Sequence, residues 1–245
     1  MKKLFLLAAL LFPLAVAAQI PIDQDWARFS YYEKDNQAVK ERPVAVLFGD
    51  SITRNWVRCD NDFLVEHQFL GRGIGGQTTL QMVSRFRTDV IELHPQYVAI
   101  LAGINDIARN TGYIDVKNTF GNIVSMVELA QVNGIRPVLC TVLPAGEIGW
   151  RREVGDPRPL IDSLNALIRQ YAADNHLPLA DYHAAMKDAD NALDAAYVTD
   201  AVHPNLAGYK VMEKLLLEVL GKDCRLYEKK RLPVKISSKP IISNK

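Results

Sequence analysis

The sequence predicts an α/β fold, namely a three-layer α/β/α sandwich around a central, mainly parallel sheet of about five strands. Several apolar runs of the 245-residue chain are continuous rather than alternating, which is typical of parallel strands covered on both faces. Stretches with apolar residues three and four positions apart separate these runs and indicate helices. Strands that alternate with helices favour right-handed crossovers, which place helices on both faces of the sheet.

The elements are expected in a regular order. The runs that predict strands are 43–49, a second apolar segment just before Gly71, 97–102, 137–142 and 177–182. The stretches that predict helices are 77–93, one around 116–130, one around 160–171, and about 205–220. On the helix expected at 77–93, one face carries Leu80, Val83, Phe86, Val90 and Ile91. Ligands of such folds sit at the carboxyl ends of the strands, so the residues after each strand are the functional candidates.

The N-terminus predicts a signal peptide at 1–18. A short basic start precedes an apolar run and the small-residue pattern Ala15-Val16-Ala17. The run is shorter than the roughly 20 residues that span a bilayer. We therefore expect export to the periplasm or the extracellular space, with no stable membrane insertion after cleavage, and an uncleaved anchor is the alternative.

Three further segments follow the signal peptide. They are a lead-in segment (19–42), one folded domain (43–221) and a basic tail (222–245). The tail carries eight Lys or Arg residues against two acidic ones. Such a composition predicts a solvated tail, with a binding arm as the alternative.

Composition limits the partners. The formal net charge of +1 gives no reason to expect a nucleic acid or a membrane surface as a partner. The three cysteines, Cys59, Cys140 and Cys224, match no metal-binding spacing and imply no disulfide framework. Cys140 lies in an apolar run and is expected to be a small buried residue. Nothing in the sequence predicts a metal or another cofactor.

Polar residues follow the predicted strands where chemistry is expected. Ser51 comes directly after the first strand, at a turn into a helix whose N-terminal N–H groups favour negative charge. Alternatively, Asp50 or Ser51 only caps that helix. Asn105 follows the strand at 97–102, where its amide can face a developing oxyanion, with a simple turn as the alternative.

Asp200 and His203 are three residues apart, ahead of the last predicted helix. On one turn of chain, the carboxylate can hold the tautomer of the imidazole. Pro204 suits the first position of the helix that follows. The alternative is a solvated loop histidine. Together these residues supply a nucleophile, a base, an orienting carboxylate and oxyanion donors, which are the groups that acyl transfer needs.

A glycine run offers a different interpretation. Gly71, Gly73 and Gly76 match G-x-G-x-x-G, so a dinucleotide site has to be considered. The context is unfavourable, because this fingerprint belongs on the first strand of its unit and is followed by an acid at the end of the next strand. Here that next strand ends in Ala102-Gly103.

Four motifs, taken in order, resemble the four conserved blocks of the SGNH (GDSL-type) hydrolases, with the surroundings of Gly76 similar to the platelet-activating-factor acetylhydrolase-like branch. The resemblance covers roughly 43–220, and Ile52 stands where the name motif has leucine. The motifs are Phe48-Gly49-Asp50-Ser51-Ile52, Gly76, Gly103-Ile104-Asn105-Asp106 and Asp200-Ala201-Val202-His203-Pro204.

The resemblance implies a flavodoxin-like fold and a serine ester hydrolase that needs no cofactor and no metal. It implies Ser51 as nucleophile, His203 as general base and Asp200 as the residue that orients the base. The oxyanion would be held by the backbone N–H groups of Ser51 and Gly76 and by the side-chain amide of Asn105.

The substrate class is inferred from the apolar runs and from the predicted export. No run suggests a large apolar lid or acyl tunnel, which favours short acyl groups, and export favours a carbohydrate ester. The candidate substrate-binding residues are Asp50 and, in the connection 143–159, Trp150, Arg151 and Arg152. The alternatives are a lysophospholipase or thioesterase with longer acyl chains, or a catalytically silent glycan-binding module.

Overall fold

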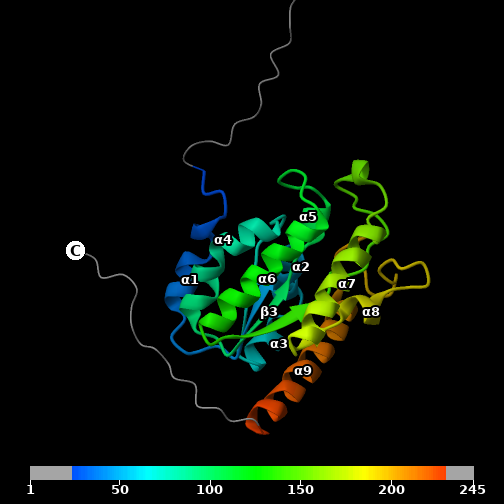
Figure 1. Cartoon of the computed structure of the whole chain (residues 1–245). Helices are drawn as coiled ribbons and strands as arrows, with labels where there is room; N and C mark the ends of the chain where they lie inside the picture. The colour runs from blue at the N-terminus through cyan, green and yellow to red at the C-terminus, as the bar shows by residue number, and fades with distance from the viewer. Residues whose placement is uncertain (1–23, 230–245) are drawn as a thin grey trace, which may run out of the picture.

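The computed structural model describes the backbone of residues 24–229 and the side chains of 24–222 (Figure 1). The signal peptide predicted at 1–18 and the end of the predicted tail, 230–245, lie outside the described residues.

A five-stranded sheet of parallel strands forms the centre, as the sequence predicts, in the order β2-β1-β3-β4-β5. The strands are β1 (Ala45–Gly49), β2 (Phe69–Gly73), β3 (Tyr97–Leu101), β4 (Arg136–Cys140) and β5 (Leu179–Ala180). Every residue of β1 and β3 is buried, which explains their unbroken apolar sequences. The edge strand β2 is only partly buried. The predicted α/β/α sandwich is confirmed.

Helices cover both faces of the sheet. In chain order the α-helices are α1 (Glu33–Ala38), α2 (Ser51–Cys59), α3 (Asn61–Glu66), α4 (Thr79–Asp89), α5 (Ile104–Ile107), α6 (Val116–Val132), α7 (Arg158–Asp174), α8 (Tyr182–Met186) and α9 (Leu206–Lys229). The 3₁₀ turns are η1 (Phe29–Tyr32), η2 (Ile91–Leu93) and η3 (Arg152–Val154). In Figure 1, α4, α6 and α7 lie side by side over one face, and α2, α3 and α9 pack on the other.

The helix expected at 77–93 differs from the observed one. It begins only at Thr79, after a capping box formed by Thr78 and Gln81, and ends at Asp89. Leu80, expected on the apolar face, is 49% exposed. The buried face instead includes Arg85 and Asp89, which form an ion pair within the core. Because two opposite charges neutralise each other there, the buried stripe is not the purely apolar one that periodicity indicates.

The last helix also differs in its bounds. It starts at Leu206, and the side chain of Asn205 accepts a hydrogen bond from the N–H of Gly208, so Pro204 precedes the helix rather than opening it. The helix continues to Lys229, so the backbone of the segment expected to be a tail from 222 begins as the end of α9.

Candidate active site

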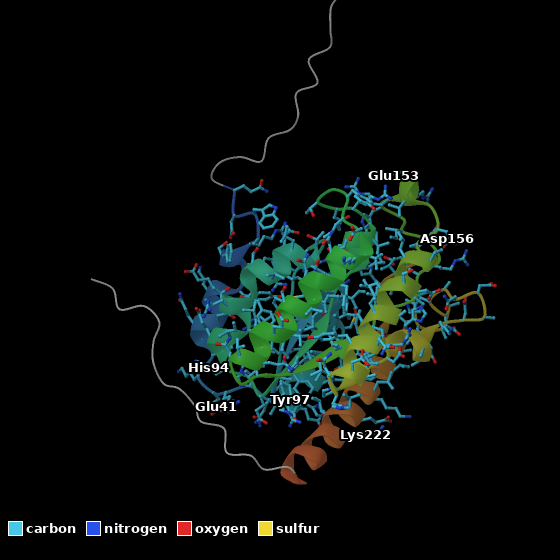
Figure 2. All side chains as sticks on the ribbon, viewed as in Figure 1. Glu41, His94, Tyr97, Glu153, Asp156 and Lys222 are labelled. Atoms are coloured by element: carbon cyan, nitrogen blue, oxygen red, sulfur yellow. The ribbon has the colours of Figure 1, made fainter. Side chains whose placement is uncertain are left out.

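The candidate residues gather at the carboxyl edge of the sheet, where β1 lies between β2 and β3. The strand order reverses at this point, which is where open parallel sheets hold their ligands. The ends of the three strands are level, since Gly49 pairs with both Gly73 and Leu101. Figure 2 shows Tyr97, the first residue of β3, far from Glu153, which follows β4 at the opposite end of the molecule.

Ser51, His203 and Asp200 form a continuous chain of hydrogen bonds. The Oγ atom of Ser51 lies 2.9 Å from Nε2 of His203. The Nδ1 atom of the same ring lies 2.8 Å from Oδ2 of Asp200. With Nδ1–H donating to the carboxylate, Nε2 is left to accept from the serine hydroxyl. The serine is therefore bonded to a group that can take its proton.

His203 is carried by a short loop, residues 196–205, which we call the histidine loop. The N–H and hydroxyl of Thr199 both donate to the carbonyl of His203, over 2.8 and 2.9 Å. Oδ1 of Asp200 accepts from the N–H groups of Val202 and His203, each over 2.8 Å. Partial burial opposes the effect of these hydrogen bonds, but together with the bond from the imidazole they lower the pKa of Asp200. The carboxylate is thus held charged beside the ring.

Asp50 is a buried helix cap. Its side chain is the N-cap of α2 and accepts from the N–H of Ile52 over 2.9 Å. Its second oxygen accepts from the amide of Asn105 over 3.1 Å. Because the carboxyl group is 1% exposed, desolvation raises its pKa to about 6. The expectation that Asp50 binds substrate is therefore corrected: the capping alternative holds, and the side chain positions α2 and Asn105.

Two backbone N–H groups lie free beside the serine. Ser51 is the first residue of α2, where N–H groups have no intrahelical acceptor. Gly76 has a φ of +79°, in the left-handed region that favours glycine. Within the part of the chain that the structure describes, neither N–H group has a hydrogen-bond acceptor. Both remain available to a negatively charged oxygen.

The third predicted oxyanion donor is already engaged. The Nδ2 atom of Asn105 donates to Oδ2 of Asp50 and, over 3.0 Å, to the carbonyl of Gln77. A negatively charged oxygen near Ser51 would have to share one of these protons in a three-centre bond. The carboxylate of Asp50 and an oxyanion therefore compete for the same amide.

Asn110 links the parts of the site, and the sequence analysis missed it. Its Nδ2 atom donates to Oδ1 of Asn105 over 2.8 Å and to the carbonyl of Gly76 over 3.1 Å. Its Oδ1 atom accepts from Nε1 of Trp150 over 3.1 Å. The only sequence signal was an asparagine soon after the Gly103–Asp106 motif. Gly76 and Trp150 lie far from Asn110 in the chain, so spacing could not reveal these two contacts.

Of the three substrate-binding candidates in the connection 143–159, only Trp150 has a described contact with His203. The indole ring centroid is 6.1 Å from that of the His203 imidazole, and the side chain is 43% exposed. Arg151 pairs with Glu153 at 3.4 Å, and Arg152 is exposed in η3. Among the described residues, no hydrogen bond or ion pair links either arginine to the serine or the histidine. The expectation that both bind substrate is not supported by this placement.

Arg85, which no sequence pattern indicated as part of the site, links backbone segments there by hydrogen bonds. Its guanidinium donates to the carbonyls of Gly49 and Arg72, over 2.9 and 3.0 Å, and to the side chain of Gln77. It thus ties the ends of β1 and β2 to the loop that carries Gly76. The sequence did carry one signal for Arg85. Asp89 follows it by four positions in α4, and oppositely charged residues at that spacing pair on a helix.

The glycine run does not form a nucleotide-binding turn. Gly71 and Gly73 lie inside β2 rather than after it. A Cβ atom on Gly73 would lie 2.3 Å from the backbone nitrogen of Arg54, and one on Gly71 would lie 2.2 Å from the side chain of Val57. These glycines therefore let α2 approach the edge strand, and the dinucleotide alternative is dropped.

The remaining polar groups indicate no metal centre. Among the side chains of residues 24–222, no group of three or more His, Cys, Asp or Glu residues is arranged to hold a metal ion. Within residues 24–229, no helix is long and apolar enough to cross a membrane. Cys59 is exposed and Cys140 is buried, both as free thiols, and desolvation raises the pKa of Cys140 to about 12. The side chain of Cys224 lies outside the described residues.

Comparison with known proteins finds several relatives of this chain. A GDSL-like lipase from Bacteroides thetaiotaomicron, known from a crystal structure, is 44% identical, and the match covers 80% of this chain and 98% of that one with a TM-score of 0.78. The acetylxylan esterase of Geobacillus stearothermophilus is 25% identical, over 62% of this chain and 71% of its own length. The lipoprotein YqeF of Bacillus subtilis is 29% identical, over 62% of this chain and 76% of its own. The model of the GDSL-like lipase/acylhydrolase family matches residues 47–211, and this chain belongs to that family.

Proposed function

We propose that this protein is an exported serine ester hydrolase that removes short acyl groups, above all acetyl, from carbohydrate. The single observation that carries the proposal is the hydrogen-bond chain from Ser51 through His203 to Asp200, with bonds of 2.9 and 2.8 Å. A silent binding module has no need of this chain of proton acceptors.

In the proposed first step, Oγ of Ser51 attacks the ester carbonyl while Nε2 of His203 takes the hydroxyl proton. Asp200 holds the imidazole in the correct tautomer and stabilises the imidazolium. The imidazolium then gives its proton to the leaving alcohol, and an acyl-enzyme remains. Water attacks this acyl group in the second step, with His203 again as the base, which releases the acid and restores the serine.

The oxyanion of each tetrahedral intermediate is stabilised by the free N–H groups of Ser51 and Gly76. Asn105 adds a third donor by sharing a proton that Asp50 accepts in the resting site. One such donor is typically worth about 10²–10³ in turnover. Asn105→Ala is therefore expected to reduce kcat by about that factor rather than abolish activity.

The short acyl group, its sugar carrier and export each have their own support. The acetylxylan esterase named above supports a short acyl group on a sugar. Trp150, exposed beside the imidazole, offers an aromatic face on which a sugar ring can pack. The predicted signal peptide supports export, and so does the relation to a lipoprotein.

Hydrolysis of p-nitrophenyl esters from acetate to decanoate tests the proposal, with Ser51→Ala alongside. We expect the rate to peak at acetate and to vanish in the variant, because no other group at the site forms an acyl-enzyme. A peak at long chains would keep the mechanism and replace the substrate by lysophospholipids or thioesters. Wild-type rates in Ser51→Ala would refute the serine mechanism.

A further inference from the structure

A groove with two unpaired arginines runs alongside the candidate site. Its volume is about 480 Å³, and it lies against the open edge of β2, between η1, α2 and α3. The lining residues that matter here are Tyr31, Tyr32, Asp35, Arg54, Arg58 and Arg72. Three arginines against one aspartate make the groove electropositive.

One face of α2 connects this groove to the nucleophile. Ser51, Arg54 and Arg58 occupy positions i, i+3 and i+7, which form a single stripe on a helix. The opposite face carries Ile52 and Trp56, both buried in the core. Seven residues of helix extend about 10 Å, so the stripe joins Ser51 to two arginines that line the groove.

Arg54 lies between the two sites. A Cβ atom on Gly75 would lie 2.5 Å from an Nη atom of Arg54, so the guanidinium packs against the backbone just before Gly76. Its Nε atom is buried and has no hydrogen-bond partner among the described residues. A buried donor without an acceptor costs free energy, and an anionic ligand would remove that cost.

The other two arginines, Arg72 and Arg58, differ in whether they already have hydrogen-bond partners. Arg72 donates to Asn36 and to the carbonyl of Gly71, and its guanidinium lies over the ring of Tyr32. Arg58 is exposed and, like Arg54, forms no ion pair within the described part of the chain. Two guanidinium groups on α2 are therefore free to bind an anion.

The tyrosines define what kind of anion fits. Tyr31 is 42% exposed and packs edge-on against Tyr32, with ring centroids 4.8 Å apart. The exposed ring gives an apolar surface beside the guanidinium groups. A ligand with both a flat apolar face and a carboxylate matches this arrangement, because a guanidinium binds carboxylates through two parallel N–H bonds.

We propose that the groove binds an acidic sugar unit of the substrate, with Arg54 and Arg58 holding its carboxylate. This inference rests on the proposed esterase function and names the substrate class as acylated acidic carbohydrate. The unit in the groove lies next to the one that carries the ester at Ser51. Arg58 therefore acts on the choice of substrate and not on the chemical step.

The test compares two acetylated substrates of opposite character, an acetylated oligogalacturonate and an acetylated xylo-oligosaccharide. In Arg58→Gln, we expect the ratio of kcat/KM for the acidic over the neutral substrate to fall about tenfold, since hydrogen bonds to charged groups are worth that much or more. Arg58→Lys should restore part of the ratio by restoring the charge. Arg87→Gln, at an exposed position of α4, is the matched control.

Binding measured without turnover separates this inference from the proposed function. Calorimetry of Ser51→Ala with unacetylated oligogalacturonate should show binding that is lost when Arg58→Gln is added. Binding that survives this second substitution would overturn the groove assignment, as would an unchanged substrate ratio. Competition by inorganic phosphate with none by galacturonate would also overturn it. If the esterase proposal itself is wrong, the wild-type protein will hydrolyse none of the esters, which is a separate outcome from loss of binding in the groove.

Discussion

Asn110 donates a hydrogen bond from Nδ2 to Oδ1 of Asn105 over 2.8 Å. An amide that accepts on its oxygen must present its NH₂ group on the other side, which here is the side of Asp50 and the nucleophile. The contact therefore fixes which end of Asn105 faces the reacting atoms. Asn110 is a positioning residue, because it acts through its neighbour.

Asn110→Ala is expected to lower kcat on p-nitrophenyl acetate about 10- to 100-fold with little change in KM, because the misplaced amide no longer meets the oxyanion. Asn175→Ala removes a similar side-chain-to-backbone bond at an exposed helix end and is the control. Trp150→Phe keeps an aromatic ring but loses the N–H bond to Asn110, so its kcat should lie between those of Asn110→Ala and Asn175→Ala. Equal kcat in Asn110→Ala and wild type would contradict the positioning role.

The base and its carboxylate are expected to differ in their effects. His203→Ala removes the proton acceptor and should lower kcat about as far as Ser51→Ala does. Asp200→Asn should leave more activity, because the amide oxygen can still accept from the N–H groups of Val202 and His203 and keep the loop in place. Steady-state kinetics on one ester compares the three variants. An Asp200→Asn rate below that of His203→Ala would reverse the assigned roles.

Arg85→Ala is expected to lower the free energy of unfolding by about 3–5 kcal/mol. The substitution leaves Asp89 as an uncompensated buried charge and frees the carbonyls of Gly49 and Arg72. Arg87→Ala, exposed on the same helix, should change it by less than about 0.5 kcal/mol. Urea unfolding followed by circular dichroism measures both. Similar losses of unfolding free energy in Arg85→Ala and Arg87→Ala would contradict the stabilising role of the buried arginine.

Asp50 should make the stability of the protein depend on pH. Its carboxyl has a pKa of about 6 in the folded state against 3.8 ordinarily, so the folded state holds the proton more tightly. Stability contributed by this group is then greatest below pH 4 and falls as pH rises to about 7, by about 3 kcal/mol.

Asp50→Asn removes this titration. The stability difference between wild type and the variant should shift in favour of the variant as the pH rises from 4 to 7, when both are unfolded in urea. Asp62→Asn, at an exposed position of α3, is the control for the general effect of losing a carboxylate. Parallel curves for wild type and Asp50→Asn would contradict the raised pKa of the buried carboxyl group.

Much of the fold followed from the sequence because local pattern and burial agree. The strands β1 and β3 are buried along their whole length, so their unbroken apolar runs were enough to predict them as buried strands. The order of the strands was not predictable, since it depends on pairings between distant segments. Leu80 was placed wrongly because Arg85 and Asp89 occupy buried positions that periodicity assigns to apolar side chains.

The candidate site was partly predictable for a similar reason. Ser51, Asn105 and His203 each follow a strand or precede a helix, and parallel topology brings such positions to one edge. Asn110 could not be found, because its partner Gly76 is 34 residues away and contributes only a carbonyl. Side-chain bonds to distant backbone groups leave no pattern in a sequence.

Most hydrogen bonds of the histidine loop stay within the loop, while the buried side chain of Val202 anchors it to the core. A bridge between Val198 and Pro204 closes it, and the hydrogen bonds of Thr199 and Asp200 stay within its ten residues. To open, this unit has to withdraw Val202 from the core but breaks no hydrogen bond of the sheet, so we expect opening to cost less free energy than global unfolding. On heating, the enzyme should therefore lose its base before it loses its fold, and cooling should return it. Reversible heat inactivation below the melting temperature is thus built into the way His203 is delivered to Ser51.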